Sequence, residues 1–250
     1  MTGTEQGKLS LREVAREMWA VYRVHWKFLV PAAIVVLLPQ SIADALVEGF
    51  HLEHLRSFAD FAALGGALLT AAVNLFGQAV YAGLTAAAVV EWRAGQPLPR
   101  LSALLRAMPI KRLIVLDLVV TLLVAIGFVL LIVPGLIVLT YIAISPAVLK
   151  LEHLGVQEAL ARSIQLVRGR ARQVFVTAIG PILLSELAVQ AVAAPFDGVA
   201  ILTVVNLLAE GIFQPIEGLA IALVAIHLLE LHGEAPAPDQ MARELVGEPE

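Results

Sequence analysis

The sequence predicts an all-α integral membrane protein with six transmembrane helices, and three observations lead to this fold class. The 250-residue chain is 59% hydrophobic and 15% charged, with a mean hydropathy of +0.86, which is far more apolar than a soluble domain of this length. Its apolar residues are gathered in long runs, and about 20 such residues cross the hydrocarbon core of a bilayer. Sixteen of the 17 Lys and Arg residues lie in the two terminal segments and in alternate connections between these runs, and only Arg56 lies in the other connections.

Six runs approach or exceed the length of a membrane span. They cover residues 28–47, 61–90, 113–133, 135–149, 174–194 and 199–229. Only Pro134-Gly135 separates the third run from the fourth, and we expect a short hairpin turn there because proline lacks an N–H donor and glycine accepts turn conformations. The sixth run is longer than a bilayer requires and contains Pro215, where we expect a break. Residues 1–232 are expected to form one membrane domain, and residues 233–250 a flexible, acidic cytoplasmic tail.

The distribution of basic residues predicts the topology. Five of them precede the first run, five separate the second run from the third, and five separate the fourth from the fifth. Cytoplasmic loops carry such an excess of Lys and Arg, so these connections and both termini are expected in the cytoplasm. The high Ala and Arg usage with few Lys is typical of a bacterium, which predicts the bacterial cytoplasmic (inner) membrane. Membrane lipids are the expected partners of the basic residues, rather than nucleic acid, because anionic headgroups lie nearest to them.

Each cytoplasmic segment also has the pattern of a basic amphipathic helix lying in the membrane interface. Similar tetrapeptides mark the three segments, at residues 13–16 (EVAR), 103–106 (ALLR) and 159–162 (ALAR). Each tetrapeptide is followed by further basic residues and by two apolar runs, which predicts three parallel repeats related by an axis along the membrane normal. The alternative is that any protein with positive cytoplasmic loops and paired spans shows this pattern.

Residues 133–175 contain a series of short motifs: Pro134-Gly135, Glu152 followed by Gly155, Glu158-Ala159-Leu160, Arg162-Ser163 and Leu166-Val167-Arg168-Gly169. In these motifs the chain resembles the membrane domain of bacterial glycerophosphodiester phosphodiesterases and the related YciC-like six-span membrane proteins, and the likeness extends over most of its length. The resemblance implies six spans with interfacial helices and no agreed activity for the stand-alone form. It does not imply phosphodiesterase chemistry, which belongs to a separate soluble domain in that family. The exit from the last run, residues 226–233, departs from the aromatic and basic pattern expected of the family.

Acidic and amide side chains inside the runs are the strongest functional signal in the sequence. Asn206, Glu210, Gln214 and Glu217 recur every three or four residues of the sixth run, so they share one face of a helix. Polar side chains of the other runs are Asn74, Gln78, Tyr81, Asp117, Glu186 and Gln190. An ionised carboxylate at mid-membrane costs about 3 kcal/mol or more, so such groups are expected to face protein or water and to be protonated or paired.

Three interpretations of these polar residues stay open. The first is a proton- or cation-responsive polar cavity, with members Asn74, Gln78, Glu186, Asn206, Glu210, Gln214 and Glu217. The second is structural: protonated carboxyls and amides hydrogen-bond between helices that pack through glycines. In the third, a break at Pro215 leaves Asn206 and Glu210 near the outer surface. A separate set of basic residues is expected to anchor the topology and to contact anionic headgroups: Arg162, Arg168, Arg170 and Arg172.

No constellation in the sequence is typical of catalysis, so we predict a non-enzymatic protein with no catalytic residue, cofactor or metal centre. Its expected function is lipid interaction, or service as a scaffold or partner of other membrane proteins. The alternative is a small proton- or cation-coupled transporter that uses the intramembrane carboxylates. A membrane-embedded enzyme acting on lipid is the third hypothesis, and only Asp117, Glu186, Glu210 and Glu217 could serve it. The oligomeric state stays open.

Overall fold

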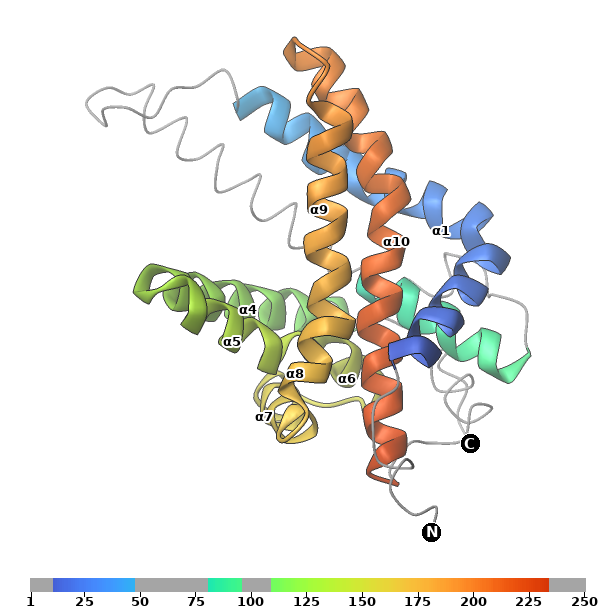
Figure 1. The fold of residues 1–250 in the computed structure, drawn as a ribbon, viewed down its shortest axis with the longest axis vertical. Helices are drawn as coiled ribbons and strands as arrows, with labels where there is room; N and C mark the ends of the chain where they lie inside the picture. The colour runs from blue at the N-terminus through green and yellow to red at the C-terminus, as the bar shows by residue number, and fades with distance from the viewer. Residues whose placement is uncertain (1–10, 48–80, 96–108, 234–250) are drawn as a thin grey trace.

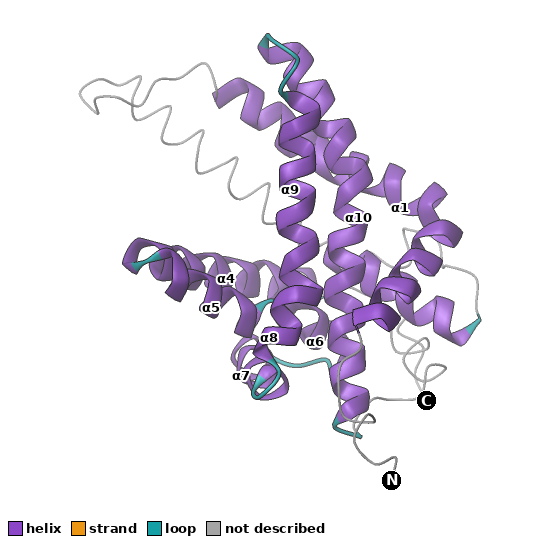
Figure 2. Cartoon of the chain, in the orientation of Figure 1, coloured by secondary structure: helices purple, strands orange, loops and turns teal. Residues whose placement is uncertain are grey.

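The computed structural model describes residues 11–47, 81–95 and 109–233, and within these ranges the chain is helical apart from short turns, with no strand (Figure 2). One further helical segment covers residues 81–94. The named helices are α1 (Leu11–Val47), α4 (Ile110–Leu130), α5 (Ile132–Ile142), α6 (Ser145–Leu151), α7 (Val156–Val167), α8 (Ala171–Val174), the π-helical turn η1 (Phe175–Ile179), α9 (Gly180–Ala193) and α10 (Val199–Leu231).

Four stretches of the described residues are long and apolar enough to cross a membrane: Leu11–Pro39, Val133–Leu151, Ala171–Ala193 and Ala200–Leu231. Large apolar side chains on these helices face outward, and Leu184 is 69% exposed. Such a surface suits the hydrocarbon of a bilayer rather than water. For the described residues the all-helical fold is confirmed, and the four apolar stretches fit a multi-pass membrane protein.

The six spans and the threefold repeat stay predictions. The second predicted run lies outside the described residues up to residue 80, and so does the amphipathic segment 102–108 on which the middle repeat depends. The two other amphipathic segments differ from one another. Residues 156–167 form the separate short helix α7, whereas the N-terminal segment continues without interruption into the first apolar run as α1. An interfacial helix that is separate from the first span is therefore not observed.

The turn between α4 and α5 lies at Leu131 rather than at Pro134-Gly135. Leu131 has an extended backbone with φ −172° and ψ 156°, and Pro134 falls in the first turn of α5. Proline is tolerated there because the first N–H groups of a helix have no intrahelical acceptor. Gly135 has a packing role instead: a Cβ atom on Gly127 of α4 would lie only 2.9 Å from the Cα atom of Gly135. The glycine pair thus lets the two helices approach closely.

Helix α10 passes through Pro215 without the expected break. Close contacts hold the helix on both sides of the proline. A Cβ atom on Gly211 would lie 2.5 Å from Ile34 Cγ1 of α1, and one on Gly218 would lie 2.6 Å from Thr85 Cγ2. Small residues that let backbones approach in this way are typical of helix packing in membranes.

Two pairs of helices lie crosswise to one another (Figure 1). In Figure 1, α9 and α10 run side by side along the long axis, and α4 and α5 lie side by side, crosswise to that pair. The short helix α6 packs against both α4 and α10. The first half of α4 therefore lies near the middle of α9 and α10. Because it crosses them, α4 does not pack closely along the length of either helix.

Candidate functional site: an acidic cavity between six helical segments

A cavity of about 260 Å³ lies where α4, α5, α6, α9, α10 and the 81–94 segment meet. Its polar lining residues are Tyr81, Asp117 of α4, Glu186 of α9, and Gln214 and Glu217 of α10. The remaining lining residues are apolar, such as Leu113, Ile142 and Ile221. Five polar side chains from four helical segments, far apart in the sequence, are thus gathered in one apolar surrounding.

Helical periodicity explains how α10 and α4 turn these residues toward the cavity. Gln214 and Glu217 are three residues apart on α10 and share a face with Ile221. Asp117 lies four residues after Leu113, which is buried and lines the same cavity. Asp117, Gln214 and Glu217 are half-buried, whereas Glu186 is exposed at the edge of the cavity.

Tyr81 closes the cavity from the side of the 81–94 segment. Its side chain is only 1% exposed, and its hydroxyl donates a hydrogen bond of 3.1 Å to the carbonyl oxygen of Leu29 in α1. The ring of Tyr81 therefore lines the cavity, whereas its hydroxyl proton is used in the hydrogen bond to Leu29. This contact also ties the 81–94 segment to α1.

Ser185 of α9 contacts the carboxyl group of Glu217 across the helix interface. The Ser185 Oγ atom also lies 2.8 Å from the carbonyl oxygen of Ile182. A hydroxyl has one proton to donate, so it cannot donate to both oxygens at once. If Glu217 is ionised, Ser185 donates to the carboxylate; if Glu217 is protonated, it donates to Ser185, which then donates to Ile182. The geometry accommodates both charge states of Glu217.

The charge balance of the cavity is one-sided. None of the described residues that line it is Lys, Arg or His, whereas three are carboxylic acids. Ionised carboxylates in an apolar site without a cation cost several kcal/mol, so they bind protons or attract a positive ion. In the part of the chain that the structure describes, no group of three or more His, Asp or Glu residues is arranged to hold a metal ion. The acidic lining of the cavity suits protons or a positive ion.

The structure brings together only part of the predicted polar set. Glu186, Gln214 and Glu217 line the cavity, and Asp117 joins them. Asn206 and Glu210 lie nearer the start of α10, do not line it, and are half-buried. Because α10 is continuous, the break at Pro215 on which the third interpretation depends is not observed. Two predicted members, Asn74 and Gln78, lie outside the described residues.

The predicted headgroup-binding arginines also divide into groups. The guanidinium of Arg162 is engaged by Glu152, with Nε 3.0 Å from Oε2 and Nη2 3.1 Å from Oε1. Arg168 and Arg172 are exposed, and Arg170 is half-buried. Lys150, which the charge pattern assigns to a cytoplasmic connection, is instead buried in α6 at 2% exposure. Arg168 and Arg172 therefore remain the members best placed for lipid.

A cluster of charges that the sequence does not single out joins three helical segments. Arg93 Nε lies 2.5 Å from Glu17 Oε1 of α1, and Arg93 Nη1 lies 2.5 Å from Glu230 Oε1 of α10. His227 Nε2 lies 3.5 Å from Glu17 Oε2. Burial alone would lower the pKa of Arg93, but the hydrogen bonds and charges of Glu17 and Glu230 raise it. The only sequence signal was indirect, because His227 and Glu230 belong to the exit segment that departs from the family pattern.

Comparison with known proteins found no match: no family model fits the chain, no curated protein matches its sequence, and no solved structure matches its fold. The likeness to the membrane domain of glycerophosphodiester phosphodiesterases therefore stays a prediction. The function has to be argued from the geometry of the site.

Proposed function

We propose that this chain is a non-enzymatic multi-pass membrane protein that takes up protons or a small cation in its acidic cavity, as a small proton- or cation-coupled transporter does. The observation that carries the proposal is the convergence of Asp117, Glu186 and Glu217 on one cavity whose described lining contains no basic residue. An anionic substrate would be repelled there, whereas a positive charge would be stabilised.

The position of the carboxylates links their charge to helix packing. Asp117, Glu186 and Glu217 come from α4, α9 and α10, so any change in their charge alters the interaction among these three helices. Polar and ionisable residues in such positions mark ion and proton pathways in many membrane proteins. The two hydrogen-bonding arrangements of Ser185 allow Glu217 to change charge without a new partner. The volume, about 260 Å³, leaves space for several water molecules.

Proton flux into liposomes tests the proposal. The purified protein is reconstituted into vesicles that contain a pH-sensitive dye, and a pH gradient and a membrane potential are imposed. We expect the wild type to carry protons and Glu217→Gln to lose at least 10-fold of the rate, because the amide cannot titrate. Asp197→Asn is the matched control, since Asp197 is exposed at the α9–α10 turn and does not line the cavity. Absence of flux by the wild type under every imposed gradient would contradict the proposal.

Lipid contact is the second candidate function, and it is favoured by the surroundings of α8. Arg168 and Arg172 are exposed, and large apolar side chains of the following helix, including Leu183, Leu184 and Leu187, are exposed as well. Basic side chains next to an apolar surface suit the headgroup region of a bilayer. Charge reversal of Arg168 and Arg172 together is expected to weaken retention of anionic lipid during purification. Unchanged retention would remove this candidate.

A further inference from the structure

A second hollow of about 340 Å³ lies on the other side of Ser185 from the acidic cavity. It is bounded by the start of α1 from Leu11 to Met18, by residues of η1 and α9 from Val176 to Ser185, and by Phe213 and Ile216 of α10. We call it the apolar groove. Its two polar lining side chains are turned to internal partners. Thr177 Oγ1 donates to the Gln173 carbonyl oxygen at 2.8 Å, and Ser185 contacts Ile182 and Glu217.

The apolar groove continues into a neighbouring hollow with a different character. The two hollows share Leu11, Val176 and Thr177, and the second adds Arg172 and Gln173. Arg172 is exposed, so its guanidinium is accessible from outside. The Oε1 atom of Gln173 is buried and has no hydrogen-bond partner among the described residues. A buried carbonyl oxygen without a donor is costly, so a turn of the Gln173 side chain toward a donor in the hollow that it lines would lower the free energy.

We propose that the apolar groove and its mouth form a site for one phospholipid whose headgroup carries a hydrogen-bond donor. One of the two acyl chains lies in the apolar groove, and the phosphate lies against Arg172. An N–H of the headgroup donates to Gln173 Oε1 once that side chain turns toward the mouth. The positive charge of Arg172 at the mouth of the groove is complementary to a phosphate. The apolar lining of the groove provides no hydrogen-bond partner for a polar ligand. A volume of about 340 Å³ is at the small end of ligand pockets, which suits one acyl chain rather than a folded segment of protein. The proposal is independent of proton uptake by the acidic cavity.

Native mass spectrometry of protein purified from membranes in mild detergent tests the apolar part of the site. We expect the wild type to retain one phospholipid per chain, and Ala15→Trp to lose it because an indole ring fills the groove. Ala15 is exposed on α1, so the larger side chain does not enter the core. The matched control is Ala191→Trp, at an exposed position of α9 that does not line the groove. Retention of lipid by Ala15→Trp, equal loss in Ala191→Trp, or a wild type without lipid would overturn the proposal.

The headgroup part is tested by offering two lipids to the delipidated protein. Phosphatidylethanolamine has N–H donors, whereas phosphatidylcholine has none. One hydrogen bond predicts a preference of about fivefold for phosphatidylethanolamine in the wild type. Gln173→Leu should abolish this preference, and Arg172→Gln should weaken binding of both lipids. Arg23→Gln, at an exposed position of α1 outside both hollows, is the control and should weaken neither. Equal affinities for the two lipids in the wild type would contradict the role of Gln173. Proton flux is measured separately, so its failure and the failure of the lipid site are distinguished.

Discussion

Ser185 of α9 and Glu217 of α10 form a hydrogen bond that separates the acidic cavity from the apolar groove. Ser185 lines the groove with its helix face, while Glu217 lines the cavity. The bond therefore lies between a cavity lined by carboxylic acids and a groove lined by apolar side chains. The Ser185–Glu217 hydrogen bond stabilises the packing of α9 on α10 at the place where the cavity and the groove meet.

The first prediction concerns the energy of this bond. Ser185→Ala and Glu217→Leu each remove one partner, because neither new side chain can form a hydrogen bond, and a double-mutant cycle isolates their interaction. Hydrogen bonds between membrane helices have coupling energies of about 0.6 kcal/mol, so the two changes should be less than additive by about that amount. Thermal unfolding in detergent, followed by circular dichroism, gives the change in stability of the two single variants and of the double variant relative to the wild type. Strict additivity would show that Ser185 and Glu217 do not interact.

The second prediction concerns Arg93, which links Glu17 of α1 to Glu230 of α10. Arg93→Gln leaves two carboxylates without their cation, and the Glu17 side chain is only 15% exposed. We expect a loss of about 2 kcal/mol of unfolding free energy, since these groups are partly screened by solvent. Arg23→Gln, on the exposed surface of α1, is the control and should have little effect. Adding Glu17→Gln to Arg93→Gln should restore part of the loss, and a further loss would contradict the ion-pair explanation.

The same cluster predicts a pH dependence. Because Glu17 and Glu230 raise the pKa of Arg93, the guanidinium binds its proton more tightly in the folded chain than in the unfolded chain. The contribution of Arg93 to the unfolding free energy is then fully present below the ordinary pKa of arginine. It is lost only when the pH rises above that value. His227 also lies beside Glu17, so the interval to compare starts above the ordinary pKa of histidine. The stability difference between wild type and Arg93→Gln should be constant from about pH 8 to about pH 10. A difference that disappears as the pH rises within this interval would contradict the assignment.

The third prediction concerns the packing of α10. Gly218→Ala places a methyl group about 2.6 Å from the Cγ2 atom of Thr85, so the 81–94 segment must move away from α10. Overpacking of this kind costs about 2 kcal/mol. Gly180→Ala is the matched helical control, because its nearest neighbour would be the Phe175 carbonyl oxygen at 4.0 Å. Chemical or thermal unfolding should separate the two variants clearly, and equal stabilities would show that Gly218 is not a close contact.

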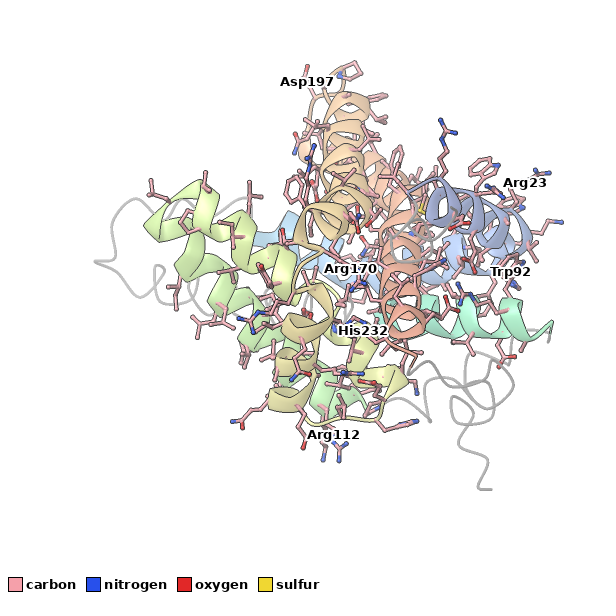
Figure 3. All side chains as sticks on the ribbon, turned by 60° about the horizontal axis from the view of Figure 1, so that its bottom comes forward. Arg23, Trp92, Arg112, Arg170, Asp197 and His232 are labelled. Atoms are coloured by element: carbon pink, nitrogen blue, oxygen red, sulfur yellow. The ribbon has the colours of Figure 1, made fainter. Side chains whose placement is uncertain are left out.

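The fourth prediction concerns topology. Asp197 precedes α10 and His232 follows it, and Figure 3 shows Asp197 apart from His232 and Arg112, at the far end of the molecule. The chain contains no cysteine, so single cysteines can be introduced at these two positions without background labelling. An impermeant maleimide should label Asp197→Cys in intact cells, and should label His232→Cys only after permeabilisation. Labelling of both positions in intact cells, or the reverse pattern, would contradict the predicted orientation.

The limits of sequence analysis are visible at particular residues. Glu186, Gln214 and Glu217 were predicted as a polar set because charged and amide side chains are conspicuous in apolar runs, and they do share a cavity. Asn206 and Glu210 fit the same helical spacing but do not line it. Spacing defines a stripe along a helix, and the partner helices decide which part of that stripe they cover. The break predicted at Pro215 and the turn predicted at Pro134-Gly135 are both wrong, because each proline lies within a helix. Whether a proline interrupts a helix depends on its position in the helix and on the packing around it.

By itself, the sequence determined that this protein is α-helical and that its long apolar stretches suit a bilayer. The reason is local: a lipid-exposed backbone must satisfy its own hydrogen bonds, and apolar length and helical period are properties of consecutive residues. Only the tertiary structure decided which side chains meet. Arg93 finds Glu17 at a separation of 76 residues and Glu230 at 137, and Asp117 reaches the cavity of α9 and α10 because α4 lies crosswise to them. Such pairings depend on how whole helices are rotated and crossed relative to one another. The periodicity of a single helix does not define that arrangement.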